Sequence, residues 1–205
     1  METLCIHTTM QNISVALVSN NKISHHTDDN TTAQSEKIFS LIDYFLKKQN
    51  ITIQQIKNVC CTNGPGSFIG IRVAHSILNC LKIIDQETQI FGVSNMDILF
   101  SQFEIDDARV VLNARKDRVY IQDYLNKKKS SPITTAHVSE IVTQLNIIID
   151  DSLKNSISSS YVGQINAYYL AKYVQKHLPS SSTHKLLPEY VLPINAVPSK
   201  KIFDL

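Results

Sequence analysis

The stretch that decides the fold is GPGSFIGIR, residues 64–72, which holds three of the five glycines in a chain of 205 residues. The apolar run IKNVCCTN at residues 56–63 leads into it and is typical of a short buried strand. From Ser67 to about residue 83 the apolar residues follow helical spacing. A strand, a glycine-rich turn and a long helix in this order allow the backbone to approach a neighbouring group closely at a helix N-terminus.

Helix N-termini attract anions, so phosphate binding is one interpretation of the turn. The spacing favours it weakly, because no lysine follows Gly70 as a P-loop requires, and Gly70 stands one position too late for a GxGxxG motif. The alternative is a tight turn with close packing. In that interpretation Ser67 caps the helix, and Gly70 and Ala74, one turn apart, form a smooth patch for another helix.

The segments around this stretch predict an α/β layered fold. Short β-branched runs at 3–9, 12–19 and 22–27 indicate three opening strands, and residues 35–48 carry the apolar spacing of a helix. Residues 88–93 predict another strand. A helix follows over 94–103, with Ser94 as its N-cap.

The second half differs in character after the acidic run at 104–107. Residues 108–115 and 117–125 predict a hairpin, 136–149 a helix, 158–163 a strand and 165–178 a final helix that ends before Pro179. We therefore expect two lobes, at residues 1–104 and 105–205.

Composition narrows the classes of function. Twenty basic and 18 acidic residues give a net charge of +2, which is too balanced for a strong nucleic-acid binder. No apolar run is long enough to cross a bilayer and no signal peptide is visible, so we expect a cytoplasmic protein with no membrane contact. The four cysteines lack metal-ligand spacing, which predicts buried free thiols.

Several landmarks resemble the TsaB family, also called YeaZ. NGPGSFIGIRVAHSILNCL is similar to that family's Gly-Pro-Gly-Ser-Phe-Thr-Gly-x-Arg signature, with Ile69 in place of threonine. LCIHTTMQNISVAL resembles its opening strand pair, SEKIFSLIDYFL its Ser-Glu helix, NARKDRVYIQDY its Asp-Ala-Arg stretch and LPEYVLPINAV its C-terminal segment. These landmarks occur in the family's order along nearly the whole chain.

The resemblance implies the actin and Hsp70-like ATPase (ASKHA, ribonuclease H-like) fold with a reduced second lobe. It also implies a role in forming N6-threonylcarbamoyladenosine next to the anticodon of tRNAs that read codons beginning with A. In the family, the catalytic subunit is the paralogue TsaD, TsaB pairs with it and the ATPase TsaE joins them. The tRNA would be engaged mainly through TsaD.

Chemistry by this chain itself is not expected. Actin-like phosphotransferases end their first strand with an aspartate that helps to hold magnesium, whereas this chain has His7 followed by Thr8. Asn113 replaces a second usual aspartate, and Lys116, Asp117 and Arg118 replace an Arg-Gly-Glu stretch. We interpret His7, Thr8 and Asn113 as a degenerate nucleotide site with no cofactor and no metal. No pair of histidines has the HExxH spacing of a zinc protease.

The resemblance instead predicts a non-catalytic subunit that binds TsaD through two helices of the first lobe. The apolar stripes of these helices are wider than contact with one face of a sheet requires, which supports this interpretation. The apolar residues in excess are Phe39, Leu46, Ile71, Ala74 and Leu78, and Arg72 lies on a polar rim. Two alternatives stay open: an autonomous nucleotide-binding protein, and a homodimeric scaffold that uses the same helices. The complete predicted interface comprises Ser35, Glu36, Phe39, Ile42, Leu46, Gly64, Pro65, Gly66, Ser67, Phe68, Gly70, Ile71, Arg72, Ala74, His75 and Leu78.

Overall fold

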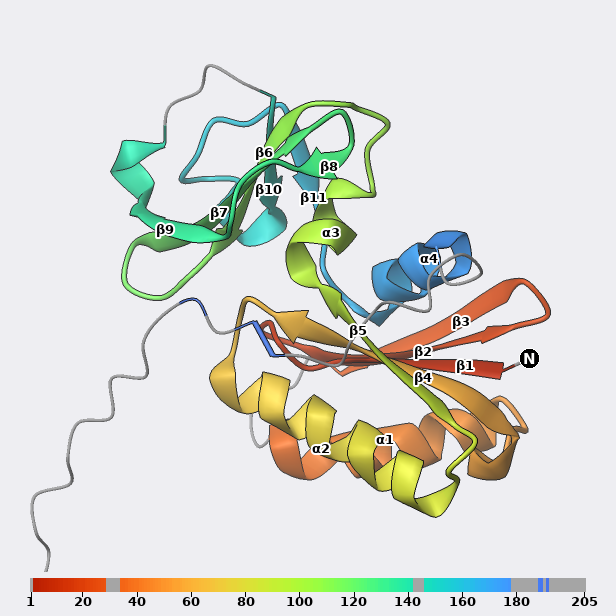
Figure 1. Cartoon of the computed structure of the whole chain (residues 1–205). Helices are drawn as coiled ribbons and strands as arrows, with labels where there is room; N and C mark the ends of the chain where they lie inside the picture. The colour runs from red at the N-terminus through yellow and green to blue at the C-terminus, as the bar shows by residue number, and fades with distance from the viewer. Residues whose placement is uncertain (1, 29–33, 142–145, 178–187, 190, 192–205) are drawn as a thin grey trace, which may run out of the picture.

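The computed structural model describes residues 2–28, 34–141, 146–177, 188–189 and 191, and Figure 1 shows their arrangement. The first sheet has the strand order β3-β2-β1-β4-β5 within these residues. β1 is antiparallel to β2 and parallel to β4, so the chain crosses over through a helix between β3 and β4. Its strands are β1 (Glu2–His7), β2 (Ile13–Ser19), β3 (Lys22–Asp28), β4 (Ile56–Gly64) and β5 (Gln89–Ser94).

Helices cover both faces of this sheet (Figure 1). α1 (Gln34–Lys48) and α2 (Phe68–Ile84) lie on one face, and α4 (Ala167–His177) lies on the other. The strand residues explain this sandwich, since alternate side chains point to opposite faces. Leu4 and Ile6 pack in the core under α1 and α2, whereas Cys5 packs under α4. Because both faces are covered, the central strands are continuously apolar rather than alternating.

The second sheet has the order β11-β10-β6-β7-β8 in the described part of the chain, and β9 pairs with β7. α3 (Asn95–Phe100) connects the two sheets, with Ile98 in the core of the first and Met96 and Leu99 in the core of the second. The strands are β6 (Ala108–Asn113), β7 (Arg118–Leu125), β8 (Lys128–Lys129), β9 (Thr134–His137), β10 (Ile147–Asp150) and β11 (Tyr161–Gly163), and the short 3-10 turns are η1 (Ile53–Gln55), η2 (Val138–Glu140) and η3 (Asp151–Leu153).

Most of the predicted elements of the first half form where we expected them. The predicted helix over 136–149 is wrong: its start belongs to β9 and η2, and its end, Ile147–Asp150, is β10. Residues 142–145 lie outside the described residues. The β-branched run Ile147–Ile149 fits between β6 and β11 as a buried parallel strand, and this pairing outweighs the helical spacing.

The final helix also differs from the expected lobe organisation. α4 follows the second sheet in sequence, but its Ala167, Leu170 and Ala171 are buried against the first sheet. The lobes at 1–104 and 105–205 therefore stay a prediction, with α4 as a segment that packs across the boundary. None of the described helices is both long and apolar enough to pass through a bilayer.

Candidate functional site

The glycine motif packs against the turn that follows β1. A Cβ atom on Gly70 would lie 1.9 Å from the Thr8 carbonyl oxygen, and one on Gly66 would lie 2.4 Å from that of Thr9. Thr8 Oγ1 donates to the Gly70 carbonyl at 2.7 Å, and the Ser67 amide donates to the Thr9 carbonyl at 2.8 Å. The absent side chains therefore make room for this chain's own backbone.

The prediction that Gly70 and Ala74 form a smooth patch for another helix is therefore wrong. Gly70 is buried against Thr8, and Ala74 is fully buried in the core between α2 and the first sheet. The N-cap prediction is confirmed, since Ser67 Oγ accepts a hydrogen bond from the Gly70 amide at 3.2 Å. Ser94 likewise caps α3 through the Met96 amide at 3.3 Å. Both serines thus satisfy helix amides that would otherwise lack partners.

A buried polar cluster lies at the carboxyl ends of β1 and β4. His7 Nδ1 is 3.3 Å from Thr62 Oγ1, which is 2.9 Å from Thr9 Oγ1. The Asn95 amide donates to Thr9 Oγ1 and to the Pro65 carbonyl, each at 2.8 Å. The cluster therefore ties the β1–β2 turn, β4 and α3 together around the glycine motif.

His7 is neutral in this cluster. It is 1% exposed, and burial lowers the pKa of its imidazole to about 3. His7 is therefore a packed, hydrogen-bonded residue at the end of β1. Within the described residues, His7 Nε2 and Asn95 Oδ1 have no hydrogen-bond partner.

The cluster does not fit the magnesium nucleotide that the fold implies. A hard cation takes oxygen ligands and favours carboxylates, whereas this cluster offers an imidazole, threonine hydroxyls and an amide. No group of three or more His, Cys, Asp or Glu side chains able to hold a metal occurs among the described residues. Asn113 is exposed on the second sheet. Its backbone amide donates to Asp150 Oδ2 at 2.7 Å, and its side-chain amide donates to Ser152 Oγ at 3.0 Å. The structure therefore does not bring Asn113 together with His7 and Thr8.

The outer sides of α1 and α2 form the second candidate site. Of the apolar residues predicted to be in excess, Phe39 is 58% exposed, as a partner surface requires. The same expectation is wrong for Leu46, Ile71, Ala74 and Leu78, which are buried beneath their helices. Ile42 is 7% exposed and also belongs to this core. The two helices need these side chains to cover their own sheet, so a partner would contact the opposite side of each helix.

The remaining predicted interface residues divide between surface and interior. Glu36 and Arg72 are exposed, and the Arg72 guanidinium lies 3.9 Å from the centre of the half-buried Phe68 ring. His75 is half-buried, its Nε2 lies 3.0 Å from Asn63 Oδ1, and burial lowers its pKa. Gly66 and Ser67 are half-buried, Gly64 and Pro65 are buried, and the side chain of Ser35 lies outside the described residues.

The sequence interpretation did not identify the apolar side chains with the largest exposed fractions on these helices. Ile69 is 66% exposed, Ile83 is 79% exposed and Ile84 is 67% exposed, all on α2, and Tyr44 is exposed on α1. A signal for Ile69 was present, because isoleucine stands where the family signature has threonine. We define the outer face of the α1/α2 layer as Glu36, Phe39, Tyr44, Ile69, Arg72, Cys80, Ile83 and Ile84.

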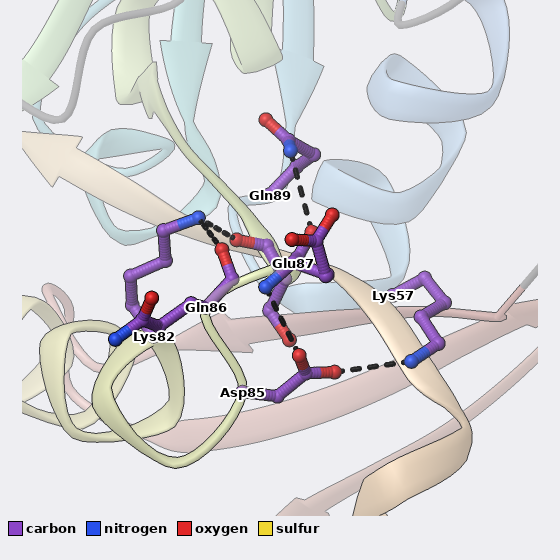
Figure 2. Close-up of polar contacts among 7 residues, drawn as sticks. Lys57, Lys82, Asp85, Gln86, Glu87 and Gln89 are labelled. Carbon is purple, nitrogen blue, oxygen red and sulfur yellow. Dashed lines mark hydrogen bonds and ion pairs between the residues drawn. The ribbon is translucent and has the colours of Figure 1, made fainter.

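A cavity of about 260 Å³ extends this face at the end of α2 farthest from the glycine motif. Figure 2 shows the polar turn beside it, in which Asp85 accepts from Lys57 Nζ at 3.0 Å and from the Glu87 amide at 3.0 Å. The hydrogen bond from Lys57 lowers the pKa of Asp85. The charges at the rim are therefore paired, and the cavity presents mainly apolar groups. It is lined by Ile53, Gln54, Ile56, Lys57, Val59, Leu81, Ile84, Asp85 and Thr88.

The cysteines divide between interior and surface. Cys5, Cys60 and Cys61 are buried free thiols, as predicted, and burial raises the pKa of each. The prediction is wrong for Cys80, which is exposed on the outer side of α2. The sequence holds a signal for this exposure, because Cys80 adjoins the polar Asn79 and Ser76 on the same side of the helix.

Comparisons with known proteins agree on one family. A family model described as TsaD, tRNA N6-adenosine threonylcarbamoyltransferase, matches residues 26–181. The tRNA threonylcarbamoyladenosine biosynthesis protein TsaB of Buchnera aphidicola subsp. Schizaphis graminum is 27% identical over 155 residues, 74% of this chain and 72% of that protein. The protein of the same name from Haemophilus influenzae is 26% identical over 132 residues, 62% of this chain and 56% of its own length. The aligned part thus spans little more than half of the second relative.

Solved structures establish the fold. YeaZ from Pseudomonas aeruginosa superposes with a TM-score of 0.71 at 15% identity and covers 93% of this chain and 99% of its own. A second structure from that organism, described as similar to peptidase YeaZ, gives a TM-score of 0.76 with the same coverage. AlfA from a Bacillus subtilis plasmid, in its filament structure, gives 0.51 at 8% identity. The predicted α/β fold of actin-like ATPases is confirmed.

Proposed function

Because this chain belongs to the TsaB (YeaZ) branch of the TsaD family and takes part in tRNA threonylcarbamoyladenosine modification, we propose that it is a non-catalytic partner subunit of TsaD. In this role it supports formation of N6-threonylcarbamoyladenosine next to the anticodon of tRNAs that read codons beginning with A. TsaE joins through the complex. TsaB proteins are generally non-catalytic subunits of this pathway.

The outer face of the α1/α2 layer carries the proposal. Among the described residues, five of the seven large hydrophobic side chains that are exposed lie on these two helices: Phe39, Tyr44, Ile69, Ile83 and Ile84, against Leu125 and Val162 elsewhere. Exposed apolar groups on one helical layer with polar groups beside them are typical of protein interfaces. Glu36 and Arg72 supply such a rim, and the adjoining cavity can accept an apolar side chain of a partner.

The polar cluster at the end of β1 supports a non-catalytic role. Its histidine is neutral and buried, and its hydroxyl groups are engaged in hydrogen bonds that hold the glycine motif. A general base must reach the proton that it abstracts, and His7 at 1% exposure does not reach solvent. The cluster therefore serves the fold of the first lobe.

The decisive experiment is reconstituted tRNA modification. TsaD, TsaE, ATP and the other substrates are combined with tRNA in the presence and absence of this chain, and threonylcarbamoyladenosine is measured by mass spectrometry. We expect modification to depend on this chain. Equal product in its absence contradicts the proposal.

Two surface variants and one matched control test the surface. Ile83→Asp and Phe39→Asp place a charge on the outer face of the α1/α2 layer, and Leu125→Asp places one on a similarly exposed residue of β7. Truncated central anchors typically cost about 2 kcal/mol or more in binding, so we expect the first two variants to lose co-elution with TsaD and Leu125→Asp to keep it. Loss of pairing by Leu125→Asp alone contradicts this assignment.

The homodimeric scaffold uses the same face and stays an alternative. Five exposed apolar side chains on two helices would also suit a two-fold contact between copies of this chain. Sedimentation of the isolated chain separates the cases. A dimer that persists in the presence of excess TsaD favours the scaffold, and a dimer that TsaD dissociates favours the partner subunit.

A further inference from the structure

The segment that contains β11 and α4 has an unusual composition. Residues 161–177, YVGQINAYYLAKYVQKH, contain no aspartate or glutamate in a chain that has 18 acidic residues. They carry Lys172, Lys176 and His177 together with four tyrosines. Basic groups interleaved with aromatic rings are typical of surfaces that bind single-stranded nucleic acid.

The fold gathers these groups around a hollow. The end of α3 and the middle of α4 enclose about 240 Å³, and the lining joins tyrosines and lysines with two polar side chains. The Gln102 amide of this lining donates to the Ile98 and Gln164 carbonyls, which holds it at the rim. We define the α4 pocket as Ser101, Gln102, Tyr169, Lys172, Tyr173 and Lys176.

The aromatic rings of this surface lie close together but are inclined to one another, with Tyr168 and Tyr169 in an edge-to-face arrangement at 77°. Lys172 Nζ lies 5.0 Å from the Tyr168 ring centre and 5.9 Å from that of Tyr169. Tyr168 is in turn 5.0 Å from the His25 ring on β3. Half-buried rings lose little conformational freedom when a flat group packs against one of their faces.

The charges of the α4 pocket are available to an anion. Within the described part of the chain Lys172 has no carboxylate partner, and its cation lies over tyrosine rings. Lys176 pairs with Glu104 at 3.4 Å, but both side chains are largely exposed, at 61% and 82%. Exposed pairs of this kind are weak, so a phosphate group can replace the glutamate.

We propose that the α4 pocket binds the tRNA directly, with backbone phosphates at Lys172 and Lys176 and an unpaired base stacked against the tyrosine rings. This inference rests on the proposed function, which supplies the RNA. RNA fits better than an acidic peptide, because a peptide carboxylate uses the lysines and leaves the tyrosine faces unused. α4 and the α1/α2 layer cover opposite faces of the first sheet (Figure 1), so a partner protein and the tRNA can be bound together.

The test compares two double variants in the complete complex with TsaD. Lys172→Glu/Lys176→Glu alters the α4 pocket, and Lys116→Glu/Lys154→Glu makes the same change of charge at exposed residues of the second sheet region. The probe is a transcribed tRNA whose anticodon reads a codon beginning with A. We expect the first variant to raise the Kd about tenfold or more and to lower the slope of log affinity against log salt by about 1 to 2. The second variant should behave as the unmodified complex.

A variant that removes one aromatic ring tests base stacking separately from charge. Tyr169→Leu keeps an apolar body against the core and removes the aromatic face. We expect roughly tenfold weaker tRNA binding with an unchanged salt slope. Lys172→Arg keeps the charge and should bind as tightly as the original chain.

Two outcomes would overturn the inference: unchanged tRNA binding by Lys172→Glu/Lys176→Glu, or equal weakening of tRNA binding by both double variants. If unchanged tRNA binding is accompanied by loss of TsaE from the complex, the α4 pocket is assigned to a protein. Melting temperature and co-elution with TsaD confirm that each variant is folded and assembled. Failure of the proposed function is a distinct result, because in that case the amount of modified tRNA would be the same with and without the original chain.

Discussion

The first sheet carries α1 and α2 on one face and α4 on the other, and the two helical layers present different chemistry to solvent. The α1/α2 layer exposes Phe39, Ile69, Ile83 and Ile84, whereas α4 exposes Lys172 and Lys176 beside tyrosine rings. Beneath both layers the sheet residues that pack against the helices form buried apolar clusters. The difference therefore arises on the sides of the helices that the fold does not use, where packing places few demands on residue type.

The same comparison separates the two sides of α2. Gly70 and Ala74 face inward and are committed to contacts with the Thr8 turn and the sheet, while Ile69 and Ile83 face outward. Substitutions on the inner side should act on folding. Substitutions on the outer side should act on association.

The largest effect is expected on the inner side of α2. Gly70→Leu would place a Cβ 1.9 Å from the Thr8 carbonyl oxygen, so the turn or the helix must move. We expect a loss of about 3 kcal/mol or more in the free energy of unfolding, measured by urea denaturation. The adjacent exposed Ile69→Thr should stay within about 0.5 kcal/mol. Equal stability of the two variants would show that α2 is not held as described.

Thiol labelling distinguishes the covered face from the free one. Cys80 lies exposed on α2, whereas Cys5, Cys60 and Cys61 are buried. We expect a maleimide to modify Cys80 at least about a hundredfold faster than the other three, as followed by mass spectrometry. If the α1/α2 layer binds TsaD, the complex should protect Cys80.

The matched control uses the other face. Lys172→Cys introduces an exposed thiol on α4, which should stay reactive in the same complex. Protection of Lys172→Cys together with continued reaction of Cys80 would reverse the assignment of the two faces.

A pH-dependent effect is expected from His7, whose side chain shares the α4 face of the sheet with Cys5 by strand alternation. Folding lowers the His7 pKa from 6.5 to about 3, so between these values the unfolded chain binds a proton that the folded chain does not. The free energy of unfolding should therefore fall as pH falls through this window, by about 1.4 kcal/mol per pH unit. His7→Asn removes this contribution. An unchanged pH dependence in the variant would mean that His7 is not buried as a neutral group.

The smallest effect is expected at the β6–β7 turn, away from both helical layers. Lys116 has φ +61°, where a side chain is strained and glycine is not. Lys116→Gly should raise the free energy of unfolding by about 0.5–1 kcal/mol, measured by thermal unfolding. Lys154→Gly is the control, because Lys154 has φ −55° and should lose stability by a similar amount. Neither variant should change TsaD pairing.

Prediction from sequence succeeded where local pattern and tertiary packing agree. α1, α2 and the N-caps at Ser67 and Ser94 follow from spacing and capping residues alone. It failed at Ile147–Ile149, where apolar residues at helical spacing form a strand between β6 and β11. Neighbouring strands far apart in sequence decided that outcome, and no local signal contains them.

The candidate site divides in the same way. The sequence identified the two helices and the absence of an aspartate at His7, and both interpretations agree with the structure of the cluster and the exposure of Phe39. It assigned Leu46, Ile71, Ala74 and Leu78 to the wrong side. An apolar stripe that is wider than one sheet face indicates that the helix is buried on more than one side, but the stripe does not identify which of its residues contact the sheet.

The sequence by itself determined the family, the α/β layers, the capped helices and a histidine at the end of the first strand, because these depend on residue type and spacing along the chain. Only the tertiary structure decided that the motif glycines accommodate the Thr8–Thr9 turn, that α4 returns to the first sheet, and which side chains of each helix remain exposed. Those features depend on distances between segments that are remote in sequence. Such distances are fixed only when the whole core packs.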